Sequence, residues 1–125
     1  MLSRLYAVVG WIIIAIGILH MAATFRLPTV GNALGKTWFF GSGLAIALVG
    51  SLNLLHRAYG GSCFGVRLVC RAANVLLTLL AIVAGIVMRA SLAECLVIWL
   101  LLFGALILSF SALIRLSCPS FSNSA

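Results

Sequence analysis

Two apolar stretches decide the fold of this chain: residues 5–25, LYAVVGWIIIAIGILHMAATF, and residues 37–55, TWFFGSGLAIALVGSLNLL. Each reaches the length of about 18 residues that a helix needs to cross the hydrocarbon core of a bilayer. Two further apolar stretches follow at residues 68–88 and 92–114. The sequence therefore predicts an all-α integral membrane protein, a four-helix bundle whose helices run antiparallel, up-down-up-down.

The composition favours a membrane protein over a water-soluble one. Hydrophobic residues make up 65% of the 125 residues and charged residues only 7%, whereas a soluble domain has roughly a quarter of its residues charged. The net charge of +7 arises from Lys and Arg residues that stand singly at the ends of apolar stretches. They do not cluster with aromatic residues, as the basic residues of a nucleic-acid interface do. We therefore expect membrane lipids, and not nucleic acid, as partners.

The basic residues also predict the orientation of the chain, because Lys and Arg are retained preferentially on the cytoplasmic side. With both termini in the cytoplasm, five of the eight basic residues lie inside and three outside. The inner set is Arg4, Arg57, Arg67, Arg71 and Arg115, and the outer set is Arg26, Lys36 and Arg89. We thus expect an inner-membrane protein with a single domain at residues 1–116 and a disordered polar tail at 117–125.

The first predicted site lies toward the outer face, around the only histidine inside an apolar stretch. His20 is expected about 7 Å below the outer end of its helix, and Glu94 about 3 Å from the same side. Thr24 lies one turn from His20, and Trp38 begins the second helix at the headgroup level. An ionisable residue in a membrane helix is a candidate functional residue. This group could hold a ligand, carry a proton or lock two helices together, and for Trp38 an interfacial anchor is the preferred interpretation.

A second polar group is predicted toward the inner face. Its members on the third helix, at steps of four, three and four, are Arg67, Arg71, Asn74 and Thr78. Such spacing places side chains on one face of a helix, and the two arginines, like Arg57, can reach anionic lipid headgroups. Asn53 and Asn74 lie at similar depths on neighbouring helices. Because a buried amide in hydrocarbon needs a partner, we predict a hydrogen bond between them.

No cofactor or metal is predicted. Two histidines in a small four-helix membrane protein suggest haem, but His20 and His56 are expected roughly 20 Å apart along the bundle. They cannot ligate one iron within a protomer, although a His20 pair across a dimer stays open. Soft metal ligands near the outer face have no recognised spacing. The four cysteines form no CxxC, and neither G-x-S-x-G nor H-E-x-x-H occurs, so thiol-redox and hydrolase chemistry have no support.

A resemblance to known families rests on the first two helices. Gly17-x-x-His20 late in the first helix, Pro28 soon after it, and an aromatic, glycine-rich second helix occur together. In these features residues 10–57 resemble the DoxX-like and related uncharacterised four-helix bacterial membrane protein families. The acidic residue often seen in helix 2 of the DoxX-like group is absent, since residues 45–47 are Ala-Ile-Ala. The resemblance implies the fold and a bacterial source, and says little about activity.

Three functions stay open at this point. The first is a small polytopic membrane protein that binds a small or lipid-like molecule, or a partner membrane complex, through an outer-leaflet pocket around His20. The second is a homo-oligomeric transporter or channel subunit, and the third is a membrane-anchor subunit of an enzyme complex. The outer and inner polar groups are separated by an apolar middle, which favours binding or assembly over conduction.

Overall fold

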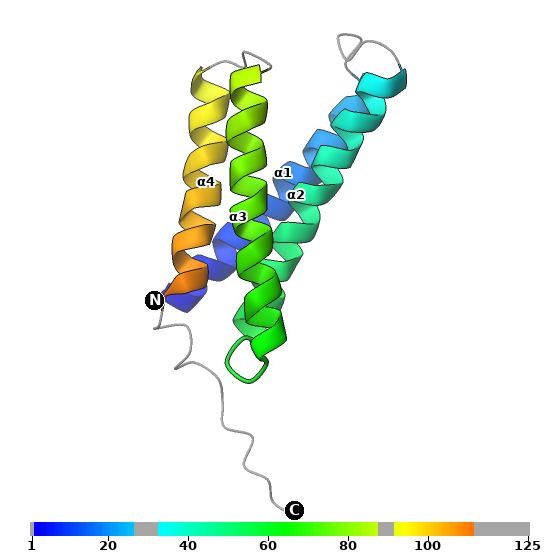
Figure 1. Ribbon diagram of the computed structural model, residues 1–125. Helices are drawn as coiled ribbons and strands as arrows, with labels where there is room; N and C mark the ends of the chain where they lie inside the picture. Colours follow the sequence, from blue (N-terminus) through cyan, green and yellow to red (C-terminus); the bar gives the residue numbers. More distant parts are fainter. Residues whose placement is uncertain (1, 27–32, 88–91, 112–125) are drawn as a thin grey trace, which may run out of the picture.

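The computed structural model describes residues 2–26, 33–87 and 92–111, with the side chains of residues 92–95 outside the description. In these ranges the chain forms the helices α1 (Leu2–Arg26), α2 (Ala33–Tyr59), α3 (Phe64–Val87) and α4 (Leu92–Phe110) (Figure 1). The predicted all-α fold with four helices is thereby confirmed. The predicted tail at 117–125 lies outside the described residues.

Three of the helices, α1, α2 and α3, are long and apolar enough to cross a membrane. In α4 the apolar segment runs Leu96–Phe110 and is shorter. Helices α1 and α2 extend beyond the apolar stretches of the sequence at both ends, and α2 begins at Ala33 and ends at Tyr59 where residues 37–55 were expected. An apolar stretch measures only the hydrocarbon depth, whereas a helix continues into the headgroup layers on both sides.

The distribution of side chains is the reverse of that in a soluble protein. Large apolar side chains point outward, and Ile86 and Leu100 are 68% and 71% exposed. Polar side chains are buried, and Asn53 and Asn74 have no exposed surface. In water this arrangement would be unfavourable, because buried polar groups and exposed apolar surface both cost free energy. The apolar surface is compatible with a lipid environment.

Glycines bring α1 and α2 into close contact along their lengths. Gly10 faces Gly50, and Gly17 faces Gly43 and Ala47 on the other helix. A Cβ added at Gly17 would lie 2.7 Å from the backbone oxygen of Gly43, so a larger residue does not fit. Small residues of α1 therefore pack against α2 within the same chain, as they do when membrane helices approach closely.

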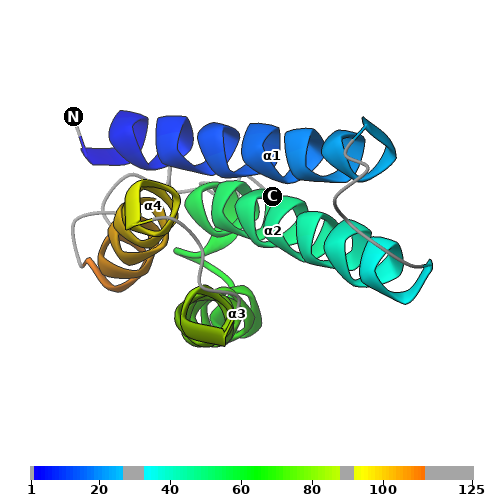
Figure 2. The ribbon, with the colours of Figure 1, turned by 90° about the horizontal axis from the view of Figure 1, so that it is seen from above.

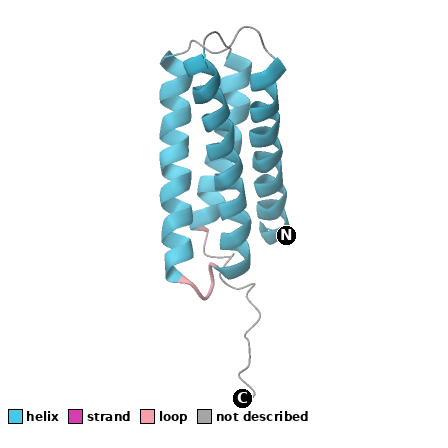
Figure 3. Cartoon of the chain, turned by 90° about the vertical axis from the view of Figure 1, so that its right-hand side faces the viewer, coloured by secondary structure: helices cyan, strands magenta, loops and turns pink. Residues whose placement is uncertain are grey.

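The two helix pairs meet at one end and separate toward the other. In Figure 1, α1 and α2 lie side by side and lean away from α3 and α4 toward the end at which α2 begins. Seen from above, α3 and α4 are viewed nearly along their axes while α1 and α2 cross the view (Figure 2). The side view in Figure 3 shows all four helices with similar inclination. We call the convergent end, where α2 ends and α3 begins, the His56 end, and the other end the His20 end.

Two small apolar clusters join the helix pairs. Val49, Leu77 and Leu102 bring α2, α3 and α4 together. Tyr6 and Leu108 join α1 to α4 nearer the His56 end. Because the apolar contacts between the pairs are few, the polar contacts at the His56 end contribute strongly to their relative placement.

Candidate functional site

The core of the candidate site is a pair of amides on neighbouring helices. Asn53 Nδ2 on α2 donates to Asn74 Oδ1 on α3 at 3.0 Å, and Asn74 Nδ2 donates to Asn53 Oδ1 at 2.9 Å. The same nitrogens also donate to backbone oxygens one turn back, those of Val49 and Cys70, at 2.8 and 2.9 Å. The two amides of the predicted contact therefore lie against each other, and every amide hydrogen can be used.

Tyr6 of α1 joins this pair from the opposite side. Its hydroxyl donates to Asn53 Oδ1 at 2.6 Å and lies 3.0 Å from His56 Nδ1. The thiol of Cys70 lies 3.7 Å from the hydroxyl and 3.5 Å from Asn53 Oδ1. Tyr6, Asn53, Cys70 and Asn74 have no exposed surface, and His56 is 4% exposed. We call these five residues the polar network; it links α1, α2 and α3 at the His56 end.

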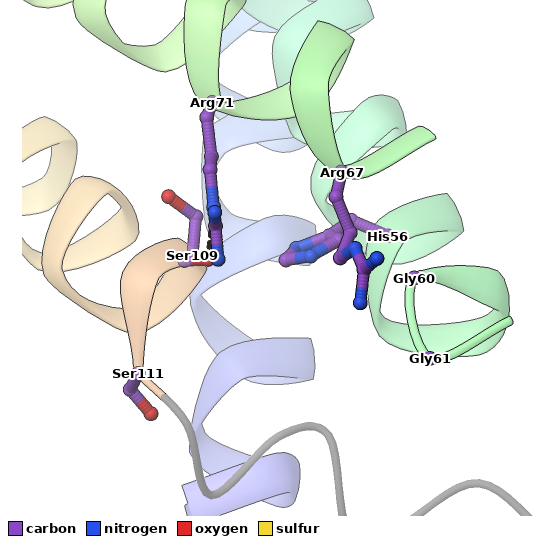
Figure 4. Close-up of a pocket in the computed structure, with 7 residues that line it drawn as sticks. All are labelled: His56, Gly60, Gly61, Arg67, Arg71, Ser109 and Ser111. Carbon is purple, nitrogen blue, oxygen red and sulfur yellow. Dashed lines mark hydrogen bonds between the residues drawn. The ribbon is translucent and has the colours of Figure 1, made fainter. Parts of the chain in front are cut away.

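A recess opens beside the polar network and is lined from α2, α3 and α4. It is small and partly open to the surroundings. Its lining consists of His56, Gly60, Gly61, Arg67, Arg71, Ser109 and Ser111. In Figure 4 both arginine side chains descend from α3, and the His56 ring lies between them in this view. We call this the basic recess.

The two arginines of the basic recess are held by neutral partners. Arg71 Nε donates to the backbone oxygen of Ser109 at 3.1 Å, and its guanidinium lies 4.6 Å from the centre of the Phe110 ring. The Arg67 guanidinium lies 5.8 Å from the centre of the Phe64 ring. Ring faces attract cations but do not neutralise them. The positive charges in the recess are thus uncompensated by these contacts.

The sequence excludes a carboxylate side chain as the missing partner. Glu94 is the only acidic residue among the 125, and it lies in the first turn of α4, at the opposite end of that helix from Ser109. The hydroxyl of Ser111 is also buried and has no hydrogen-bond partner among the residues described. Arginines without an acidic partner and a hydroxyl without a hydrogen-bond partner are groups to which an external anion can bind.

Three of the four residues predicted around His20 have described side chains. His20 stacks on Phe39 of α2, with ring centres 3.7 Å apart and planes inclined by 22°. The Thr24 hydroxyl donates to the His20 backbone oxygen at 3.2 Å, a bond internal to the helix. Trp38 is 73% exposed and points outward. The side chain of Glu94 lies outside the described residues, so its predicted contact with His20 stays a prediction.

The three predicted headgroup arginines have different surroundings. Arg67 and Arg71 line the basic recess. Arg57 instead donates from Nε to the backbone oxygen and hydroxyl of Ser3, at 2.9 and 3.1 Å, and so fastens the end of α2 to the start of α1.

Among the residues described, no three His, Cys, Asp or Glu side chains lie together as metal ligands would.

Sequence reasoning missed Tyr6 and His56 as members of the site. A tyrosine near a helix end is usually an interfacial anchor, and a histidine beside Arg57 is expected at the polar surface. One signal was available: Tyr6, Gly10 and Gly17 are spaced by four and seven residues, which places Tyr6 on the helix face that packs most closely. Asn53 and His56, three residues apart, likewise share a face of α2.

No family model, curated protein or solved structure matches this chain. The site is therefore interpreted from its own geometry.

Proposed function

We propose that this is a small polytopic membrane protein that binds a small or lipid-like molecule through an anionic phosphate group held in the basic recess. The observation that carries the proposal is the pair of guanidinium groups, from Arg67 and Arg71, in a recess for which the sequence offers no carboxylate. Arginine matches phosphate well, because its planar fork of N–H donors can bind two oxygens at once.

The basic recess is too small to enclose a drug-sized ligand, whose pockets hold about 300–1,000 Å³. It is a shallow, partly open depression, so an anionic group would bind at its mouth, against the arginine side chains. Its place at the ends of three helices puts it at the depth of lipid headgroups once the apolar surfaces lie in hydrocarbon. A phosphate-bearing lipid could seat its headgroup there while its acyl chains remain in the bilayer. A free phosphate ester would supply the same chemistry from the aqueous side.

The proposal includes the placement of the chain in the membrane. We propose that all four helices cross an inner membrane antiparallel, with both termini in the cytoplasm. The excess of basic residues at the His56 end supports this orientation. The basic recess then faces the cytoplasmic leaflet, whose anionic lipids attract basic residues at about 1 kcal/mol each. The membership in DoxX-like families implied by the resemblance stays a prediction.

The proposal differs in location from the outer-leaflet pocket predicted around His20. That pocket stays a prediction, because the Glu94 side chain lies outside the described residues. The two alternatives, a homo-oligomeric transporter or channel subunit and an anchor subunit of an enzyme complex, gain no specific support from this geometry.

Replacement of Arg67 provides the direct test. Arg67→Gln removes a recess charge without breaking a hydrogen bond between helices, whereas Arg71 also bonds to the Ser109 backbone. The matched control is Arg4→Gln, which removes the same charge from an exposed arginine at the start of α1, at the same end but outside the recess. Native mass spectrometry of the protein from phosphatidylcholine micelles with added phosphatidylglycerol measures the bound anionic lipid.

We expect Arg67→Gln to weaken phosphatidylglycerol binding about tenfold and Arg4→Gln to leave it within about twofold. A hydrogen bond to a charged group contributes about 1.5–3 kcal/mol. The lower value corresponds to about a tenfold change in the dissociation constant. Displacement of the lipid by inorganic phosphate would indicate a soluble phosphate ligand. Equal losses in both variants, or binding of phosphatidylglycerol no tighter than of phosphatidylcholine, would refute the proposal.

A further inference from the structure

The hydrogen positions in the polar network can be deduced from the arrangement of its heavy atoms. The amide orientation of Asn53 is fixed, because one amide atom faces the Val49 backbone oxygen at 2.8 Å and must be the nitrogen. The other amide atom, Oδ1, therefore faces Tyr6 and accepts hydrogen bonds only. The same reasoning fixes Asn74, whose nitrogen faces the Cys70 backbone oxygen at 2.9 Å.

The Tyr6 hydroxyl then has one available use for its hydrogen. Its oxygen lies 2.6 Å from Asn53 Oδ1, a distance at which two oxygens attract only with a hydrogen between them. Since Oδ1 has no hydrogen, the Tyr6 hydrogen must point to it. His56 Nδ1, 3.0 Å from the same hydroxyl oxygen, must therefore carry its own hydrogen and donate.

This assignment determines what His56 offers to the basic recess. In a neutral imidazole with its hydrogen on Nδ1, the other nitrogen, Nε2, has a lone pair and acts as an acceptor. His56 lines the recess, and its ring contact with Tyr6 uses Nδ1, which leaves Nε2 for the recess. Gly60 has no side chain to fill the space beside the ring, where an added Cβ would lie 2.8 Å from Nε2. The recess therefore combines two cationic donors with one fixed acceptor.

We infer that the basic recess selects an anion that also carries an O–H donor, with the negative oxygens on Arg67 and Arg71 and the O–H on His56 Nε2. The inference rests on the proposed phosphate binding and specifies which phosphate-bearing groups the recess prefers. A hydroxylated phosphodiester headgroup, such as that of phosphatidylglycerol, has both features. A phosphodiester of the same charge without a hydroxyl forgoes the hydrogen bond to the His56 nitrogen and so binds more weakly.

Two lipids of equal charge provide the probe. Phosphatidylglycerol and phosphatidylmethanol both carry one negative phosphodiester, and only phosphatidylglycerol has headgroup hydroxyls. The full chain in phosphatidylcholine micelles is mixed with equal amounts of both lipids at pH 7.5, and native mass spectrometry counts each bound lipid. We expect phosphatidylglycerol to be preferred about two- to tenfold, the factor that one neutral hydrogen bond contributes.

Two variants separate the role of His56 from general anion binding. His56→Leu removes the acceptor at similar side-chain volume, and Tyr6→Phe removes the oxygen that holds the hydrogen on Nδ1. Both variants should still bind anionic lipid through the arginines, but they should bind phosphatidylglycerol and phosphatidylmethanol about equally. Because the two variants alter different helices, the test survives if one of them does not fold.

The outcomes distinguish this inference from the proposed function. Equal binding of the two lipids to the unmodified protein, with loss of both in Arg67→Gln, would overturn the selectivity and leave phosphate binding standing. Unchanged preference in a folded Tyr6→Phe variant would overturn the assignment of the hydrogen to Nδ1. Binding of neither anionic lipid above phosphatidylcholine would overturn the proposed function itself.

Discussion

Gly17 is the position at which the contact between α1 and α2 can be tested most directly. A Cβ placed there would lie 2.6 Å from Ala47 N, 2.7 Å from Gly43 O and 2.9 Å from Ala47 Cα. Normal contacts between such atoms are about 3.5–4.0 Å, so the added methyl group would overlap by about 1 Å. All three atoms belong to the backbone of α2. They cannot rotate away as the end of a side chain can, and the two helices would have to separate.

We expect Gly17→Ala to lower the free energy of unfolding by about 2–3 kcal/mol. Overpacking costs about 1–3 kcal/mol, and this position falls in the upper part of that range because every close contact is with backbone. The measurement is unfolding by sodium dodecyl sulfate from mild detergent, followed by fluorescence of the three tryptophans in the chain. The helices persist in that detergent, so the signal reports their separation.

The matched control is Gly41→Ala on α2. A Cβ at Gly41 meets no atom within 4 Å, and alanine is favoured over glycine inside a helix by up to about 1 kcal/mol. We expect this variant to be as stable as the unmodified protein or slightly more so. If Gly17→Ala proved as stable as Gly41→Ala, the close approach of α1 and α2 at Gly17 would be refuted.

Three further predictions concern stability and orientation. Asn53→Leu should lower the free energy of unfolding by at least about 2 kcal/mol, because several buried groups lose their hydrogen-bond partner at about 1–3 kcal/mol each. Ser51→Ala, at an exposed position, should leave it unchanged in the same assay. A membrane-impermeant maleimide should leave Cys63 unlabelled in intact cells and label it in opened cells. The fully buried Cys70 should react only after unfolding. Prompt labelling of Cys63 in intact cells would reverse the proposed orientation. His20→Ala should lose about 0.5–1.5 kcal/mol of ring stacking and bind anionic lipid unchanged, and loss of that binding with intact stability would contradict our placement of the site.

The approximate positions of the helices were predictable because they depend on a single physical quantity. Hydrocarbon thickness fixes the apolar length of a crossing helix, and that length can be counted along the sequence. The depth of Asn53 and Asn74 follows from the same count at 1.5 Å per residue. Since both are amides with few alternatives in hydrocarbon, their contact could be expected before the structure was known.

The basic recess could not be predicted in the same way. It depends on how far each helix is rotated about its axis and how the two helix pairs incline, and neither follows from apolar length. Rotation of α1 by half a turn would point Tyr6 into lipid and leave every apolar stretch unchanged. The contacts of Gly10 and Gly17 with α2 fix that rotation, and they bring Tyr6 against Asn53 as a consequence.

The polar network also accounts for why the helix pairs meet at the His56 end and separate at the other. Lipid chains are as apolar as leucine, so apolar side chains give little net attraction between membrane helices. Hydrogen bonds and close packing remain, and between α2 and α3 the described hydrogen bonds all lie within the polar network. The same contacts that join the helices orient the ring of His56 toward the basic recess. Stability and ligand selectivity are therefore coupled through Tyr6 and Asn53, and a substitution that loosens the helix pairs at this end should also weaken the discrimination between the two anionic lipids.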